Sequence, residues 1–103
     1  MKYTVVFTPE AKKDLLDLYD YIADHSNTTR AMRYIERIEK SCMSFQTLPE
    51  RGTRRDDLRP GLRVMGFERR VLIAFRVSSG SVDILRILYG GRSVDLAFPQ
   101  VED

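Results

Sequence analysis

The amino-acid sequence predicts an α+β domain of two layers, in which a helical hairpin packs on a mostly antiparallel sheet. Apolar residues recur at helical spacing from 11 to 22 and again from 31 to 45. Residues 69–77 and 82–89 are rich in β-branched and aromatic residues and flank a Ser-Gly turn, as in a β-hairpin. With a strand-like segment at 3–7 and another at 58–65, the expected order is β-α-α-β-β-β, typical of an α+β fold.

Length and composition limit the possible functions. The 103 residues are expected to form one domain, 1–103, of which 93–103 is a C-terminal tail. No stretch approaches the roughly 20 apolar residues of a membrane span, and no signal peptide is recognisable, so a cytoplasmic location and no membrane partner are expected. One cysteine and one histidine cannot build a structural zinc site, and neither a metal nor another cofactor is expected.

The first helix is expected to begin at Thr8. The Thr8 side chain can accept a hydrogen bond from a free backbone N–H, and Pro9 suits the first helical position. The core side of this helix is a stripe of Ala11, Leu15, Leu18 and Ile22. Polar residues 26–29 then provide caps for a second helix, and so short a link predicts an antiparallel pair.

Some apolar residues lie off the core stripes of the two helices. They are Leu16, Tyr19, Met32 and Met43. Packing between the two helices is one explanation, and an exposed groove for a partner protein is the other.

The second half of the chain predicts a charged loop at 50–57 and then three strands. Pro60-Gly61 places the strand at 58–65 on a sheet edge or gives it a bulge. A two-residue turn at Ser79-Gly80 predicts four pairs across the last two strands: Val77 with Val82, Arg76 with Asp83, Phe75 with Ile84, and Ile73 with Arg86. Both faces of this hairpin are largely apolar, so either the C-terminal tail or a partner chain is expected to cover part of the second face.

The net charge of +2 hides an uneven distribution. Residues 1–50 have a net charge of −1, residues 51–92 of +6, and residues 93–103 of −3. All basic residues after Lys40 are arginines. Arginine binds anions and protein partners well but does not accept protons at neutral pH, so the basic segment 51–92 is suited to binding rather than to proton transfer.

A series of short segments in a fixed order carries a family resemblance over residues 3–92. The segments are Phe7-Thr8-Pro9-Glu10-Ala11, Asp14-Leu15, Tyr21-Ile22, 31–38, Leu48-Pro49, Arg51-Gly52, 55–63, Leu72-Ile73-Ala74-Phe75 and 84–92. In this order they resemble the ParE branch of the RelE/ParE toxins of type II toxin–antitoxin modules. The resemblance implies a protein that poisons DNA gyrase, is neutralised by a ParD-like antitoxin in a hetero-oligomer, and needs no cofactor.

The RelE branch, whose members cut messenger RNA on the ribosome, is the main alternative. RelE-like sequences have a lysine pair on the strand that corresponds to 58–65, and a tyrosine near the C-terminus. Here that strand has no lysine, and the tyrosine corresponds to Phe98, which cannot transfer a proton. A third possibility is a degenerate toxin whose only remaining role is to bind its antitoxin.

The candidate target-binding residues are arginines beside Pro-Gly or Gly-Gly irregularities: Arg59, Arg63, Arg70 and Arg92. Their partner is expected to be gyrase, and direct contact with nucleic acid stays open. The candidate antitoxin-binding residues are Leu16, Tyr19, Met32 and Met43.

Other residues that could carry chemistry have simpler explanations. Arg86 is either a structural partner of Asp14 or a functional residue. His25 is expected to cap a helix, and Cys42 to be a core residue. No catalytic residue is assigned.

Overall fold

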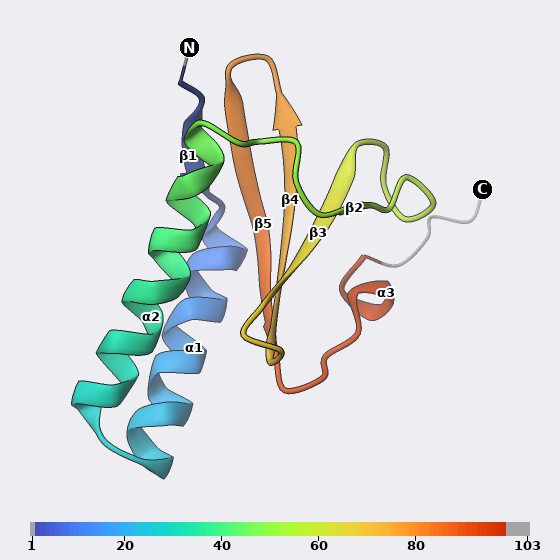
Figure 1. Ribbon diagram of the computed structural model, residues 1–103. Coiled ribbons are helices and arrows are strands. Elements are labelled where there is room, and N and C mark those ends of the chain that lie inside the picture. The colour runs from blue at the N-terminus through green and yellow to red at the C-terminus, as the bar shows by residue number, and fades with distance from the viewer. Residues whose placement is uncertain (1, 99–103) are drawn as a thin grey trace.

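In the computed structural model, which describes residues 2–98, two long helices cover one face of a mixed sheet (Figure 1). The elements are β1 (Thr4–Phe7), α1 (Pro9–His25), α2 (Thr28–Met43), η1 (Ser44–Gln46), β2 (Thr53–Arg54), β3 (Leu62–Phe67), β4 (Val71–Ser78), β5 (Ser81–Tyr89) and α3 (Val94–Ala97). The sheet order is β1-β5-β4-β3-β2, with β1 parallel to β5 and all other pairs antiparallel. The predicted α+β class and element order are confirmed.

The helices begin where the sequence predicts. The Thr8 hydroxyl accepts the Ala11 N–H at 3.1 Å, and the Asn27 side chain accepts the Arg30 N–H at 2.8 Å. The two helices run side by side as an antiparallel hairpin (Figure 1). Within residues 2–98, each helix is too short or too polar to cross a membrane.

The main core lies between this hairpin and the sheet. It includes the predicted α1 stripe, the buried face of α2, and alternate residues of β4 and β5. The ring of Phe45 stacks on that of Phe75 with centroids 4.2 Å apart, which joins the end of the helical hairpin to the middle strand.

The β4–β5 hairpin contains a bulge that the sequence did not reveal. The pairs Val77–Val82, Arg76–Asp83 and Phe75–Ile84 are confirmed. The predicted Ile73–Arg86 pair is wrong, because the register shifts between Ala74 and Phe75 so that Ile73 pairs with Ile87. An extra residue reverses the alternation of all residues beyond it. Ile87 therefore packs in the main core, and Leu88 lies on the opposite face.

The strand predicted at 58–65 begins later than expected. Residues 58–61 form turns, and strand β3 starts at Leu62. The Gly61 N–H donates to the Asp56 carboxylate at 2.8 Å, and the Arg55 N–H donates to the Leu62 carbonyl at 2.7 Å. Pro60-Gly61 therefore closes a loop before the strand instead of interrupting it. The charged segment 50–57 contains the short strand β2, which was not predicted.

A second, smaller core covers part of the outer face of the sheet. Val94 of α3 and Phe98 pack on three sheet residues, Leu62, Ala74 and Leu88. Figure 1 shows α3 lying beside the sheet on the side away from α1 and α2. The first part of the predicted tail thus provides the expected cover, and its last residues, 99–103, lie outside the described range.

Candidate functional site

The four arginines predicted to bind a target lie at two opposite ends of the sheet. Arg70 and Arg92 lie near the end of β5, where the Gly90 N–H donates to the Arg70 carbonyl at 3.2 Å. Arg59 and Arg63 lie at the other end. In the sheet register Arg63 of β3 lies opposite Arg54 of β2, and the guanidinium carbon of Arg59 is 5.8 Å from the centroid of the Phe98 ring. The structure therefore does not bring these four residues into one surface.

Several arginines of the basic segment 51–92 form ion pairs within the fold. Arg54 pairs with Asp56 at 2.9 Å, and Arg55 joins Asp57 and Asp95 at 2.9 and 2.8 Å. Hydrogen bonds from Arg54 hold the pKa of Asp56 below its usual range. The net charge of this segment therefore overstates how much of it is available to a partner.

Arg86 has a structural role. Strand β1 ends at Phe7 opposite Ile84, so the next residues of β5 have no strand neighbour on that side. There the Asp14 carboxylate accepts the Ile87 N–H at 2.9 Å and two bonds from Arg86, at 2.7 and 3.0 Å. Asp14 is buried, so the pair satisfies a charge that would otherwise be costly to bury.

Three of the four predicted antitoxin-binding residues lie together. Leu16 and Tyr19 of α1 and Met32 of α2 line an open groove along the helical hairpin, with Leu15 and Ile35 beside them. Leu16 and Met32 are 65% and 48% exposed. Met43 lies at the far end of α2 and does not line this groove. We call this surface the hairpin groove.

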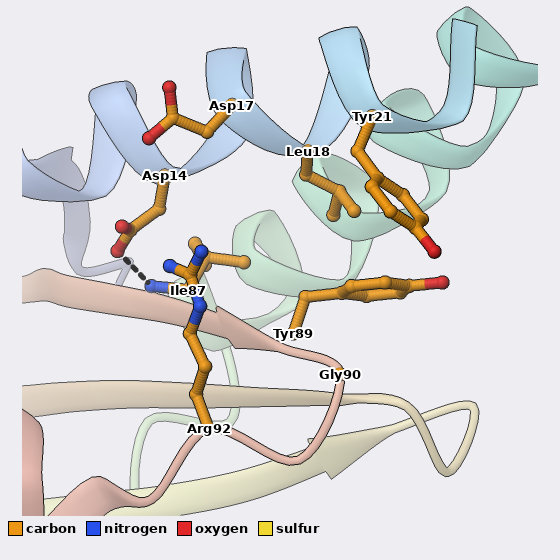
Figure 2. A pocket seen from close by; sticks show the side chains of 8 residues that line it. All are labelled: Asp14, Asp17, Leu18, Tyr21, Ile87, Tyr89, Gly90 and Arg92. Atoms are coloured by element: carbon orange, nitrogen blue, oxygen red, sulfur yellow. Dashed lines mark hydrogen bonds between the residues drawn. The ribbon is translucent and has the colours of Figure 1, made fainter. Parts of the chain in front are cut away.

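A concavity lies at the end of β5, between the strand and α1. It is lined by Asp14, Asp17, Leu18, Tyr21, Ile87, Tyr89, Gly90 and Arg92. Figure 2 shows Arg92 extending from the loop after β5 toward α1, and Tyr21 of α1 lying above Tyr89. The two tyrosine rings are 5.7 Å apart between centroids.

A second concavity shares Tyr89 with the first and contains arginines that the sequence reasoning missed. It is lined by Ile22, Arg30, Arg33, Tyr34, Arg37, Arg70 and Tyr89. We call it the arginine concavity. Its α2 arginines fall at i, i+3 and i+7, a spacing that places them on one helix face and could have revealed them. The net charge of −1 over residues 1–50 conceals this basic face.

The remaining candidates have structural roles. The Nδ1 atom of His25 lies 2.8 Å from the Tyr21 carbonyl in the last turn of α1, as expected for a helix-end histidine. Cys42 is fully buried, and burial raises the pKa of its thiol to about 12. In the part of the chain that the structure describes, no group of three His, Cys, Asp or Glu side chains could hold a metal ion.

Comparison with known proteins agrees with this architecture. A family model described as the ParE toxin of the type II toxin–antitoxin system parDE matches residues 5–94. Toxin ParE1 of Mycobacterium tuberculosis is 23% identical over 95 residues, which cover 92% of this chain and 97% of the relative.

Solved structures show the same fold. A chain of the chromosomal ParDE system from P. aeruginosa superposes with a TM-score of 0.75 at 26% identity, covering 85% of this chain and 96% of that one. The toxin–antitoxin complex RelBE2 from Mycobacterium tuberculosis gives a TM-score of 0.64 at 20% identity, covering 87% of this chain and all of that one, and shares the fold.

Proposed function

This chain belongs to the ParE toxin family of type II toxin–antitoxin systems, and from that membership we propose that it poisons DNA gyrase and is neutralised by a ParD-like antitoxin. It is a toxin that acts by binding, and the cleavage chemistry is supplied by gyrase. The two parts of this proposal rest on different surfaces of the molecule.

The hairpin groove supports the antitoxin part. It presents exposed apolar side chains, Leu16 and Met32, beside the ring of Tyr19, as in grooves that receive an amphipathic helix. The related P. aeruginosa structure is of a ParDE system. We therefore assign the groove to an apolar helix face of the antitoxin.

The environment of Phe98 is the observation that carries the gyrase part. A ribosome-dependent RNase needs groups that transfer protons near its substrate. Phe98, at the position that corresponds to the RelE tyrosine, directly follows α3, is buried in the second core and has no hydroxyl. Strand β3 contributes Arg63 but no lysine. A protein with these residues is better suited to holding a target than to cutting RNA.

Of the predicted target-binding residues, we assign Arg70 and Arg92 to the gyrase contact. Both are exposed, and in residues 2–98 neither forms an ion pair. Arg63, by contrast, donates to the Arg51 carbonyl at 3.4 Å, and Arg59 lies over the Phe98 ring. The end of the sheet that contains Tyr89 is therefore the better contact surface.

Purified toxin should be added to gyrase supercoiling and cleavage reactions and, in parallel, to a translating ribosome system. We expect loss of supercoiling, accumulation of cleaved DNA and intact transcripts, with supercoiling restored when the antitoxin encoded beside the toxin is added. Transcripts cut within codons would favour the RelE-type alternative, and no effect in either system would favour a degenerate toxin.

Two double variants with equal loss of charge locate the contact. Arg70→Ala/Arg92→Ala should weaken gyrase inhibition about tenfold or more, because interface arginines commonly carry 1–2 kcal/mol or more. Arg59→Ala/Arg63→Ala changes the opposite end of the sheet. If only the second variant lost inhibition, the assignment of Arg70 and Arg92 would be wrong.

A further inference from the structure

We propose that the arginine concavity binds the phosphate backbone of a nucleic acid. The identification of this nucleic acid as the DNA held by gyrase rests on the proposed function, whereas the binding of phosphate groups does not. Four arginines, from α2 and from the β3–β4 turn, line the concavity together with Tyr34 and Tyr89.

The spacing of the arginines fits a polyanion. Arg30 and Arg37 are seven positions apart on α2, which is about 10 Å along a helix axis at 1.5 Å per residue. Successive charges on one strand of duplex DNA are about 3.4 Å apart along the axis, so this row spans several phosphates. Arg70 adds a fourth guanidinium from a separate element.

Most of the positive charge of this site is not neutralised by ion pairs within the protein. Arg37 pairs with Glu68 through bonds of 2.9 and 3.0 Å and lies 5.0 Å from the centroid of the Tyr34 ring. Across residues 2–98, neither Arg33 nor Arg70 has an ion pair, and the Arg30 side chain reaches only the Ser26 hydroxyl, at 3.4 Å. Three of the four guanidinium groups therefore remain available to an anion.

One donor in the concavity also lacks a partner. The Tyr34 hydroxyl is buried, and among the described residues nothing forms a hydrogen bond with it. A buried donor without an acceptor is energetically unfavourable. Burial raises the pKa of this tyrosine, so the hydroxyl keeps its proton and remains a donor without an acceptor in residues 2–98.

The aromatic surroundings favour a nucleic acid over an acidic peptide. Tyr89 continues from this concavity into the neighbouring one, where the half-exposed ring of Tyr21 stacks on His25 with centroids 4.1 Å apart. Exposed aromatic rings beside a basic groove are the usual means of stacking unpaired bases. The carboxylates of the neighbouring concavity are neutralised, since Asp14 pairs with Arg86 and Asp17 with Lys13.

The test measures binding of the purified toxin to fluorescein-labelled 20-nucleotide single-stranded and 20-base-pair duplex DNA by fluorescence anisotropy, over a range of salt concentrations. Arg33→Ala/Arg70→Ala should weaken binding about tenfold or more. Loss of two phosphate contacts should also reduce the slope of log K against log salt by about 1.8 for the duplex and about 1.4 for the single strand.

The matched control is Arg69→Asn/Arg76→Ala, which removes the same charge outside the concavity. Asn tolerates the left-handed backbone of Arg69, whose φ is 64°. This control should bind within about twofold of the original chain, and circular dichroism should show that all variants are folded. Equal losses in both double variants would overturn the site, as would an original chain that does not bind DNA at low salt.

Polyglutamate as a competitor separates the two kinds of anion. If polyglutamate displaced DNA at equal charge concentration, the proposal would fail in favour of an acidic protein segment. The proposal that gyrase is the target can fail separately. A toxin that binds DNA through Arg33 and Arg70 but does not inhibit gyrase would contradict the proposed function and leave this inference standing. If the original chain inhibited gyrase but Arg33→Ala/Arg70→Ala bound DNA as tightly as the original chain, this inference would be wrong and the proposed function would stand.

Discussion

The carboxylate of Asp14 accepts two hydrogen bonds from the guanidinium of Arg86, at 2.7 and 3.0 Å, across 72 positions of sequence. The same carboxylate accepts the Ile87 N–H, which β1 is too short to pair. Three bonds on one buried side chain thus attach α1 to the free edge of β5. This arrangement fixes the helical hairpin relative to the end of the sheet where both concavities lie.

Replacing Asp14 is expected to destabilise the fold strongly. Asp14→Ala leaves the Arg86 guanidinium and the Ile87 N–H without their acceptor, and should lower the free energy of unfolding by about 2–4 kcal/mol. The range extends down to about 2 kcal/mol because the Arg86 side chain is 27% exposed, so water can partly solvate its guanidinium once the carboxylate is gone. Asp17→Ala, which removes an exposed pair with Lys13, should cost less than about 0.5 kcal/mol. Urea denaturation measures both, and equal losses would contradict the structural role of Asp14.

Two glycines of equal φ provide a matched test of close packing. Gly52 and Gly80 both have φ of +77°, so an alanine at either position adopts a left-handed backbone that costs about 1–2 kcal/mol. A Cβ at Gly52 would also lie 2.5 Å from the Val64 carbonyl oxygen, whereas one at Gly80 meets nothing within 4 Å. Gly52→Ala should therefore lower the free energy of unfolding by about 1–3 kcal/mol more than Gly80→Ala. Thermal denaturation with identical midpoints would show that the backbone moves away without cost.

Cys42 is expected to make stability depend on pH in the alkaline range. Burial raises the pKa of its thiol from 9.0 to about 12, so between these values the unfolded chain releases a proton that the folded chain keeps. Below pH 9 the thiol is protonated in both states, so its contribution to the free energy of unfolding is fully present. As pH rises above 9, ionisation of Cys42 in the unfolded chain should lower the free energy of unfolding by about 1.4 kcal/mol per pH unit. Urea titrations at pH 8, 9 and 10 should show a shallower fall for Cys42→Ala, which removes the thiol. Parallel curves would mean that the thiol ionises equally in both states.

The hairpin groove should control binding of the antitoxin. Leu16→Asp places a carboxylate among apolar side chains that an antitoxin helix would bury, and should weaken binding at least tenfold. Leu96→Asp makes the same change on α3, where the side chain is 83% exposed and outside the groove, and should leave the affinity within about twofold. Calorimetric titration with the antitoxin encoded beside the toxin measures both. An unchanged affinity for Leu16→Asp would place the antitoxin elsewhere.

The helices and the turn end of the β4–β5 hairpin could be predicted because local sequence signals determine them. Thr8 and Asn27 cap as their residue types predict, and the turn at Ser79-Gly80 sets the first three pairs of β4 and β5. The bulge in β5 could not be predicted, because the sequence there is apolar on both sides and alternation gives no register. Strand β2 and helix α3 are too short for a periodic signal and depend on tertiary contacts.

The site was less predictable than the fold. The grouping of Leu16, Tyr19 and Met32 followed from helix geometry, since they lie on neighbouring faces of a hairpin. The separation of Arg59 and Arg63 from Arg70 and Arg92 depends on strand direction, which the chain order alone did not give. Likewise, whether an arginine is free or paired depends on which carboxylates the fold brings near, as Arg86 and Asp14 illustrate.

The parallel pairing of β1 with β5 has a consequence for how the domain folds. Thr4 pairs with Ser81, so this edge of the sheet closes through a contact between residues 77 positions apart. Contacts so distant in sequence form slowly, because the intervening chain loses its conformational freedom before the pairing stabilises the sheet. The β1–β5 edge is therefore expected to form after the helical pair and the β4–β5 hairpin, whose contacts are local.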